Sequence, residues 1–359
     1  MAERLEAKHK GGTLVSRKIE FTETEDPVEL AYARGWTDGL PVTPPTDERV
    51  LQMLKGTTRK ANEVVGKIPP FLAECTVEKV AINAVMAGCK PEYMPVLLAA
   101  LEAALEPVFT LHGVLATTYF SSPIIVVNGP VAKKIGMNGG INALGQGNRA
   151  NATIGRALQL IVRNVGGGIP GAIDRATLGN PGKYTFCFAE DESDPAWEPL
   201  SVARGMKRGV SAVTLFQGHG PEAFVDQKSR TPESLSKSFA LSLNKLGHDR
   251  LTQSARALLV LSPEHYAIYK EAGWDRKRIE RALYEATIRP GSDLVAGKDG
   301  VGEGIPASRA GEMVPKFHED GLMVVRAGGP AGLFSAILPG WLAGRHREEL
   351  QLVTKPVKS

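Results

Sequence analysis

Glycines and side-chain amides dominate the stretch Gly139-Gly140-Ile141-Asn142-Ala143-Leu144-Gly145-Gln146-Gly147-Asn148-Arg149-Ala150-Asn151-Ala152-Thr153-Ile154-Gly155-Arg156. Its five glycines and four amides make a poor hydrophobic core and a good ligand cradle, because glycine lets the backbone approach a ligand closely. An apolar run at 123–129 precedes the stretch and predicts a strand, and a helical pattern at 152–164 follows it. This strand, loop and helix form the centre of the predicted fold.

The start of that helix predicts a binding site for an anionic or polar ligand. Exposed N–H groups at a helix N-terminus attract negative charge, and Asn151 is the expected N-cap. The predicted anion-binding residues here are Asn148, Arg149, Asn151 and Arg156. The alternative is a long surface loop without a ligand. The spacing matches neither Gly-x-Gly-x-x-Gly after a strand nor Gly-Lys-Ser/Thr, so we do not predict a nucleotide site.

Composition places the chain among soluble globular proteins. It has 359 residues, of which 43% are hydrophobic and 23% charged, and it can bury a large core. The net charge of +4 gives no indication of nucleic-acid binding. No apolar run reaches the roughly 20 residues of a membrane span, and the charged N-terminus does not resemble a signal peptide. With three cysteines, we expect a cytoplasmic protein without a membrane partner.

The hydrophobic patterns predict an α/β fold with a mixed β-sheet covered by helices. The predicted strands lie near residues 111–118, 123–128, 184–189, 211–216, 257–261 and 322–326. An N-terminal helical hairpin is predicted at 76–87 and 91–105, where Gly88 ends the first helix. Further helices are expected at 27–35, 47–54, 231–246, 263 onward, 275–288 and 307–318.

The same patterns predict how the chain is divided. Residues 1–26 are expected to form a polar tail, and residues 27–290 the main α/β domain. The Gly-rich stretch 291–306 is a candidate linker or lid. Residues 307–359 are expected to pack back on the main domain.

The first helix of the hairpin has a polar edge formed by Glu78, Lys79 and Asn83. Lys79 and Asn83 are one turn apart and therefore point to the same side. If this edge faces a cavity, Lys79 is a candidate base or anion ligand, Glu78 is its partner and Asn83 binds the ligand. The alternative is a solvated edge of a surface helix.

Cys89 lies in the turn of the hairpin, beside Lys90 and just ahead of a helix N-terminus. Both neighbours would stabilise a thiolate and lower the pKa of Cys89, which makes it a candidate reactive thiol. The alternative is that Cys89 is a small buried hydrophobic residue, as free cysteine commonly is.

Titratable residues surround the strand predicted at 184–189. Lys183 at its start, Tyr184 within it and Glu190 after its end are candidates for proton transfer. The alternative for Lys183 and Glu190 is an exposed pair at the two strand ends. His219 stands between glycines after the next predicted strand, which makes it a candidate acid, base or metal ligand.

Gly328 and Gly329 follow the last predicted strand and form a second candidate anion cradle, although a tight turn would use the same residues. Cysteine and histidine never occur at the paired spacings of a zinc site, so no metal is predicted from the sequence. The chain also has no Cys-x-x-Cys and no Gly-x-Ser-x-Gly. No motif requires a cofactor.

A family resemblance is carried by segments that span nearly the whole chain. They are Gly35-Trp36-Thr37-Asp38-Gly39-Leu40-Pro41-Val42 through Pro45, Thr76-Val77-Glu78-Lys79-Val80-Ala81-Ile82-Asn83-Ala84-Val85-Met86-Ala87-Gly88-Cys89, Asn148-Arg149-Ala150-Asn151-Ala152-Thr153-Ile154-Gly155-Arg156, Pro181-Gly182-Lys183-Tyr184 and Ala327-Gly328-Gly329. With them the chain resembles a family of uncharacterised bacterial proteins associated with a Sec/Cys-Gly-Ser-Cys (UGSC) redox domain.

The resemblance implies that some relatives fuse this body to a small thioredoxin-like domain bearing the Sec/Cys pair. This chain has no Cys-Gly-Ser-Cys. Either a separate small subunit supplies that pair, or the chain has its own chemistry.

We therefore expect a cytoplasmic enzyme, or the large subunit of a two-component enzyme, that acts on a small polar or carboxylate-bearing metabolite. Thiol or acid–base chemistry is expected, as in an oxidoreductase or a lyase. This hypothesis requires Glu78, Cys89, Arg149 and Lys183 to line one cavity. We also expect a homo- or hetero-oligomer.

Two alternatives belong to other classes. The first is a non-catalytic scaffold that binds substrate for a small Cys/Sec-bearing redox subunit. The second is a metal-dependent hydrolase or lyase that uses His219 with His112 or His265.

Overall fold

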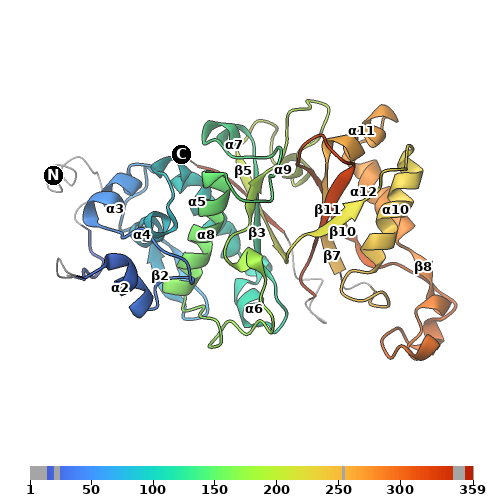
Figure 1. Cartoon of the computed structure of the whole chain (residues 1–359), viewed down its shortest axis with the longest axis horizontal. Coiled ribbons are helices and arrows are strands. Elements are labelled where there is room, and N and C mark those ends of the chain that lie inside the picture. The colour runs from blue at the N-terminus through green and yellow to red at the C-terminus, as the bar shows by residue number, and fades with distance from the viewer. Residues whose placement is uncertain (1–13, 20–24, 253–254, 343–351, 359) are drawn as a thin grey trace.

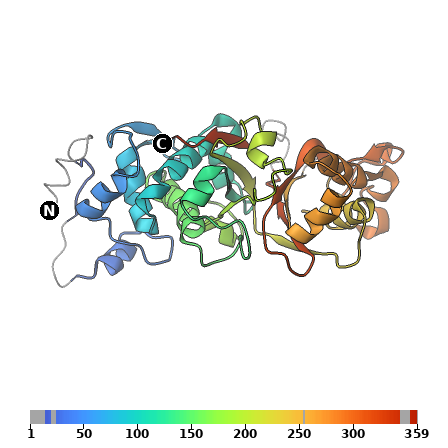
Figure 2. The ribbon, with the colours of Figure 1, turned by 90° about the horizontal axis from the view of Figure 1, so that it is seen from above.

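The computed structural model describes residues 14–19, 25–252, 255–342 and 352–358. Helices lie towards the two ends of the long axis, and the strands of the two four-stranded sheets lie between them (Figures 1 and 2). The α/β class predicted from the sequence is confirmed. The prediction of one mixed sheet is wrong, because the main strands form two four-stranded sheets that pack against each other.

The first sheet has the strand order β12-β5-β3-β4, in which β3 pairs parallel with β4 and antiparallel with β5. Its strands are β3 Ser122–Asn128, β4 Cys187–Ala189, β5 Ala212–Gly218 and β12 Val353–Pro356. Every residue of β3 is buried, because both faces of the sheet are covered. Ile125 and Val127 pack against helices, and Ile124 and Val126 pack against the second sheet.

The second sheet has the strand order β10-β7-β11-β6, in which β7 pairs parallel with β10 and antiparallel with β11. Its strands are β6 Glu222–Val225, β7 Ala255–Leu261, β10 Phe317–Arg326 and β11 Phe334–Pro339. Leu258 and Val260 face the first sheet, and Leu259 and Leu261 face helices. This alternation places one hydrophobic cluster between the sheets and one under each helical layer.

The helical layer on the first sheet is built around the predicted hairpin. Its principal helices are α3 Asp47–Leu54, α4 Val77–Ala87, α5 Met94–Ala104 and α8 Arg149–Asn164. Thr76 caps α4 by accepting a hydrogen bond from the backbone N–H of Lys79, and Gly88 ends it with φ of 88°. The predicted helical hairpin is therefore present, with α4 ending at Gly88 as expected and α5 beginning at Met94, after a 3-10 turn at Pro91–Tyr93.

The second helical layer and the remaining elements complete the fold. The second sheet is covered by α10 Pro232–Asn244, α11 Pro263–Glu271 and α12 Arg276–Ala286. Short helices are α2 Pro27–Ala33, α6 Leu111–Ala116, α7 Pro130–Lys134 and α9 Leu200–Ala203. Short strand pairs are β1 Val64–Ile68 with β2 Ala73–Thr76, and β8 Arg289–Pro290 with β9 Met313–Val314.

The strand predicted at 111–118 is wrong, because these residues form helix α6. Leu111, Val114 and Leu115 are buried, a spacing of three and four that suits one side of a helix. The strand predicted at 184–189 is shortened to β4, because residues Pro181–Lys183 form a 3-10 turn ahead of it.

The helix predicted at 152–164 begins earlier than expected. The Oδ1 atom of Asn148 accepts the backbone N–H of Asn151 at 3.0 Å, so Asn148 is the N-cap and Asn151 lies within the first turn. The helix expected at 307–318 is also wrong. Only residues Ala307–Arg309 form a 3-10 turn, and strand β9 and the start of β10 lie in the second half of the stretch.

Two predicted boundary segments are more ordered than expected. Most of the 1–26 tail lies outside the described residues, but Leu14 is buried and segment 14–19 packs on α4. The stretch 291–306 folds back through a bridge between Val295 and Ile305 and contributes to a small buried cluster. Residues 307–342 and 352–358 supply strands to both sheets.

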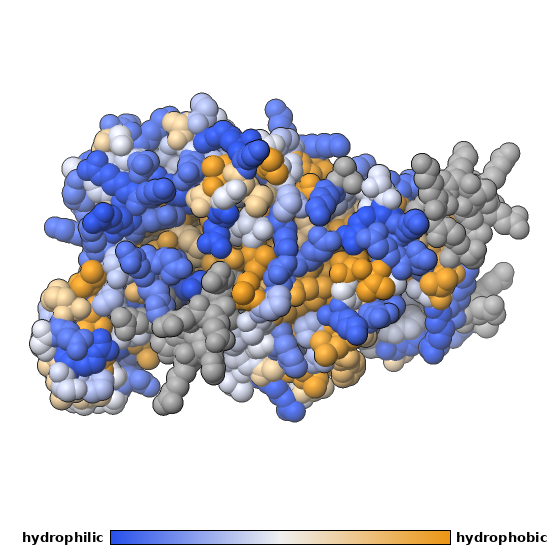
Figure 3. All heavy atoms as spheres, turned by 180° about the vertical axis from the view of Figure 1, so that it is seen from behind, coloured by the Kyte–Doolittle hydropathy of each residue, from blue (hydrophilic) through white to orange (hydrophobic). Residues whose placement is uncertain are grey.

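Apolar residues reach part of the surface. The view from behind shows hydrophilic residues over much of that face and apolar residues gathered towards its middle (Figure 3). Among the described residues, no single helix is long and apolar enough to cross a membrane. The pair Pro91–Ala104 and Pro107–Ala116 passes that test together, with a bend of 76°, and most of its residues are buried in the protein core.

A buried carboxylate joins the two halves of the structure. Glu190 follows β4 of the first sheet, and its side chain accepts hydrogen bonds from Asn128 Nδ2 at 2.7 Å and Trp197 Nε1 at 2.8 Å. It also accepts the backbone N–H of Leu200 at 2.7 Å and Arg276 Nη2 at 3.0 Å. Glu190 is therefore a structural hub and not an exposed group at a strand end.

Arg276 extends this network into the second half. It begins α12, and its guanidinium donates to the backbone oxygens of Glu198 and Val324. Its Cζ atom lies 4.5 Å from the centre of the Trp197 ring. Both members of the Glu190–Arg276 ion pair are almost fully buried. Removing Arg276 leaves the Glu190 carboxylate without a cation in the interior. Removing Glu190 takes the acceptor from the buried donors of Trp197 and Leu200 and leaves Arg276 with Glu280, at 3.3 Å, as its ion-pair partner.

We expect Glu190→Ala or Arg276→Met to lower the free energy of unfolding by about 3–5 kcal/mol. Urea denaturation followed by far-UV circular dichroism measures the change. Arg281→Ala is the matched control, because Arg281 forms an ion pair with Glu285 on the exposed face of the same helix. A loss of stability for Arg276→Met no larger than for Arg281→Ala would contradict the role of the hub.

Candidate functional site

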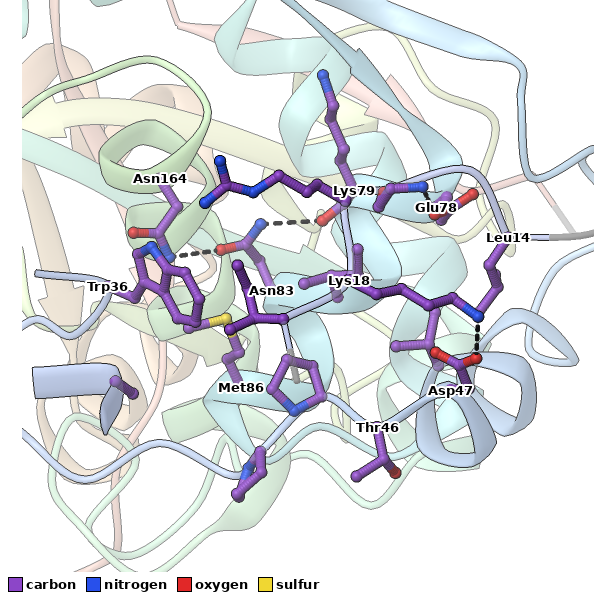
Figure 4. A pocket seen from close by; sticks show the side chains of 18 of the residues that line it. Leu14, Lys18, Trp36, Thr46, Asp47, Glu78, Lys79, Asn83, Met86 and Asn164 are labelled. Atoms are coloured by element: carbon purple, nitrogen blue, oxygen red, sulfur yellow. Dashed lines mark hydrogen bonds and ion pairs between the residues drawn. The ribbon is translucent and has the colours of Figure 1, made fainter. Parts of the chain in front are cut away.

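A cavity of about 570 Å³ lies between the N-terminal segment 14–19, α2, α3 and α4 (Figure 4). The last residue of α8, Asn164, completes it. Sites for small metabolites have volumes of roughly 300–1,000 Å³ and are mostly apolar with a few polar groups. This cavity has both properties and is the candidate functional site.

Apolar side chains form most of the wall. Trp36 comes from the loop after α2, Val50 from α3, and Ile82 and Met86 from α4. Met86 lies three residues after Asn83 and seven after Lys79, so all three occupy the same side of α4. One helix face thus presents both apolar and polar groups to the cavity.

The loop that carries Trp36 is fixed by an arginine from α8. Arg156 donates to both carboxylate oxygens of Asp38 at 2.8 Å and to the backbone oxygens of Leu40 and Pro41. A bidentate arginine–carboxylate pair fixes geometry as well as charge. Arg156, a predicted anion-binding residue, therefore acts by positioning one wall of the cavity.

Two side-chain amides contribute to the polar lining of the cavity. Asn83 Nδ2 donates to the backbone oxygen of Lys79 at 2.9 Å, and Asn83 Oδ1 accepts from Asn164 Nδ2 at 2.9 Å (Figure 4). Within the described residues, these bonds leave one N–H of each amide and the Oδ1 of Asn164 available. The pair can therefore both donate to and accept from a ligand.

Glu78 holds the N-terminal segment over the cavity. This residue is 1% exposed, and its carboxylate accepts the backbone N–H groups of Val15 at 3.1 Å and Ser16 at 2.8 Å. Arg17 and Lys18 follow on the same segment and line the cavity. We name residues 14–19 the strap, because a single buried carboxylate ties them to α4.

The charges that line the cavity are mixed. Lys18 on the strap is paired with Asp47 at the start of α3 (Figure 4). Lys79 Nζ donates to the backbone oxygen of Glu74 at 2.6 Å. Arg17 forms no hydrogen bond or ion pair with the other described residues, so the guanidinium is available to a ligand.

The predicted glycine loop packs against other parts of the protein. Asn151 is buried and bonds the backbone of Asn138 and Ala143, so its amide binds the loop itself. The backbone N–H of Gly328 donates to the oxygen of Gly139 at 3.0 Å. The two predicted anion cradles are therefore in contact with each other.

Gly329 and Asn148, two further predicted binding residues, also contact neighbouring loops of the protein. A Cβ atom on Gly329 would lie 2.4 Å from Ile141, so glycine allows the two loops to touch. Asn148 Nδ2 donates to the backbone oxygen of Gly136 at 2.8 Å.

The lowered pKa predicted for Cys89 is wrong. Its Sγ donates to the backbone oxygen of Thr153 at 3.3 Å, and burial raises the pKa of Cys89 to about 12. Arg149 is exposed and donates to the backbone oxygen of Gly88 at 2.9 Å. Burial of the thiol outweighs the arginine charge nearby, so Cys89 is neutral at physiological pH.

Lys183 and His219 lie near the end of the first sheet at which β3 begins, because Gly182 is next to Ser122 and Ser122 pairs with Gly218. Lys183 Nζ contacts both carboxylate oxygens of Asp174 at 2.6 Å. The ring of His219 lies against those of Tyr119 and Phe120, and burial lowers the pKa of His219. Tyr184 is 46% exposed, and neither it nor Lys183 lines the cavity.

The predicted residues thus do not meet in one place. Glu78, Lys79 and Asn83 share the cavity, whereas Cys89, Arg149 and the glycine loop lie near the start of α8. Among the described residues, no group of three potential metal ligands is close enough to hold an ion. Both ring nitrogens of His265 are engaged, with Ser335 Oγ and the backbone oxygen of Asp226.

Arg17 and Asn164 are among the polar residues of the cavity that were not predicted from the sequence. Arg17 lies in a segment without a hydrophobic pattern. Asn164 is the last residue of α8, whereas the predicted binding residues lie at the first turns of that helix. No spacing signal connects either residue to α4. Trp36, in contrast, stands in a rigid Pro- and Gly-rich turn beside Asp38, which was a visible signal.

Comparisons with known proteins do not identify the chain. No protein-family model, no curated protein and no solved structure matches it. The resemblance to the UGSC-associated family therefore stays a hypothesis.

We expect Glu78→Ala to release the strap, since this variant loses the acceptor for two backbone N–H groups. Trypsin should then cleave faster after Arg17 and Lys18, as followed by timed digestion and mass spectrometry. Glu74→Ala is the control, because Glu74 is an exposed glutamate of strand β2, four residues earlier. Equal cleavage rates for the two variants would show that Glu78 does not anchor the strap.

We expect all three cysteines to resist iodoacetamide at pH 7.5 in the native protein and to react after unfolding. Burial raises the pKa of Cys75 and of Cys89 to about 12, and that of Cys187 rises as well. The thiolate, which is the reactive form, is therefore scarce below pH 10. Intact-mass spectrometry counts the labels, and rapid labelling of native Cys89 would reinstate it as a reactive thiol.

Proposed function

We propose that this chain is an enzyme, or the substrate-binding large subunit of one, that binds a small metabolite with an apolar body and a carboxylate. The observation that carries the proposal is the cavity beside α4, where the paired amides of Asn83 and Asn164 adjoin an apolar wall. The proposal keeps the cytoplasmic location and the oligomer expected from the sequence.

The apolar wall would hold the body of the ligand. Trp36, Ile82 and Met86 offer an aromatic ring, a branched aliphatic side chain and a flexible thioether to one space. Burial of apolar ligand surface there contributes roughly 25 cal/mol per Å² before the cost of association. A ligand without an apolar body would not gain this binding free energy.

The carboxylate would be bound by the strap and the polar edge of α4. Arg17 can form a bidentate pair with a carboxylate, and Asn83 and Asn164 can donate one N–H each. Lys79 is the group to which we assign proton transfer, because it is the titratable amine on the same helix face. Glu78 is a positioning residue, since its carboxylate is occupied by the strap.

The second candidate function is a substrate-binding scaffold for a small subunit that carries a Cys/Sec pair. It is favoured by the burial of all three thiols, because a thiol reaction on this chain would need a thiol from another chain. Exposed Phe71 and Leu178 show that apolar side chains are available for such a contact. Co-purification tests this: activity restricted to fractions with a Cys-bearing partner would favour the scaffold.

We expect hexanoate and 3-phenylpropionate to bind the protein and the corresponding amides to bind about tenfold more weakly, because the amides lack the charge that Arg17 would pair with. Arg17→Gln should weaken carboxylate binding by a similar factor and leave amide binding unchanged. Asn83→Ala should weaken both. Isothermal titration calorimetry measures each affinity.

Lys55→Met is the matched control, because Lys55 ends α3 and does not line the cavity. Binding that is equal in the wild type, Arg17→Gln and Asn83→Ala proteins would place the ligand elsewhere and refute the proposed site.

A further inference from the structure

A second hollow, of about 390 Å³, lies at one edge of the second sheet. It is lined by residues 193–195 after β4, by Tyr266 and Lys270 on α11, and by Arg326 at the end of β10. Strands β7 and β10 are parallel, and their carboxyl ends meet at this edge. Open α/β sheets bind ligands at the carboxyl ends of parallel strands.

Arg326 is the residue that sets this hollow apart. It is 5% exposed, its Nη2 donates to Asp191 Oδ2 at 2.9 Å, and its Cζ lies 4.3 Å from the centre of the Tyr266 ring. Its Nε and Nη1 atoms are buried and have no hydrogen-bond partner within the part of the chain that the structure describes. Buried polar groups are nearly always paired, so these two nitrogens require an acceptor.

The neighbouring carboxylate is already satisfied. Asp194 accepts from Lys270 Nζ at 2.7 Å and from the backbone N–H of Ala196 at 3.0 Å. The bond from Lys270, with help from Ala196, lowers the pKa of Asp194 below its usual value. Asp194 thus holds Lys270 at the mouth of the hollow and is not the acceptor for the unpaired nitrogens of Arg326. Lys270 is half-exposed and keeps further N–H donors.

We propose that this hollow binds the oxyanion of a small molecule, a carboxylate or a phosphate, through Arg326 and Lys270. An oxyanion brings several acceptor lone pairs together, which suits the fixed fork of a guanidinium. The carboxylates of this cluster, Asp191 and Asp194, are already paired with Arg326 and Lys270, and an apolar group would leave the two nitrogens of Arg326 unpaired. The inference is independent of the proposed function, because the two sites share no residue.

The test is calorimetric titration of the full chain with potassium phosphate and with potassium acetate at constant ionic strength. We expect saturable binding of at least one anion, weakened about tenfold in Arg326→Gln through the loss of a charged donor. Lys270→Met should weaken it as well, by a smaller factor because Lys270 is half-exposed. Lys277→Met, an equal charge change at an exposed position of α12, should bind as the wild type does.

The outcomes separate the sources of the oxyanion. Binding of phosphate alone identifies a phosphorylated ligand, and binding of acetate alone identifies a carboxylate; either result supports the site. No saturable binding of either anion would overturn it, as would equal affinities in Lys270→Met and Lys277→Met. If Arg326→Gln does not fold, the comparison of Lys270→Met with Lys277→Met tests the proposal. Asn83→Ala should retain anion binding here, which separates this result from failure of the cavity proposal.

Discussion

A buried carboxylate, that of Glu190, is the constraint on which the rest of the structure depends. An ionised group in the interior is tolerated only when its oxygens are fully hydrogen-bonded and a cation is near. The donors that meet that requirement come from β3, from the loop after β4, from the start of α9 and from α12; they are Asn128, Trp197, Leu200 and Arg276. The first sheet and the outer helices of the second sheet are therefore held in one arrangement.

This arrangement also decides what occupies the carboxyl ends of the strands. At the end of β4 the protein fills the space with its own backbone: a Cβ atom on Gly139 would lie 2.7 Å from the oxygen of Ala189. The N–H of Gly328 and the amide of Asn151 are used to hold the same loop. At the ends of β7 and β10 the neighbouring segments leave a hollow, and there Arg326 keeps two donors without a partner.

The cavity lies away from both sheets, within the first helical layer. Helix α4 makes this possible because it turns Val80 and Ala84 into the core while Lys79 and Asn83 face α8 and the strap. The strap is held by two backbone N–H groups that donate to Glu78, by the buried side chain of Leu14 and by the ion pair of Lys18 with Asp47.

The sequence by itself determined the α/β class, the helical hairpin and the polar edge of α4, because periodicity and caps are local properties of the chain. It also placed Glu78, Lys79 and Asn83 together, since they share one helix. Only the tertiary structure decided that the strands form two sheets, that Cys89 is buried, and that Asn164 joins Asn83. Burial and contacts between distant segments follow from packing, which residue spacing does not record.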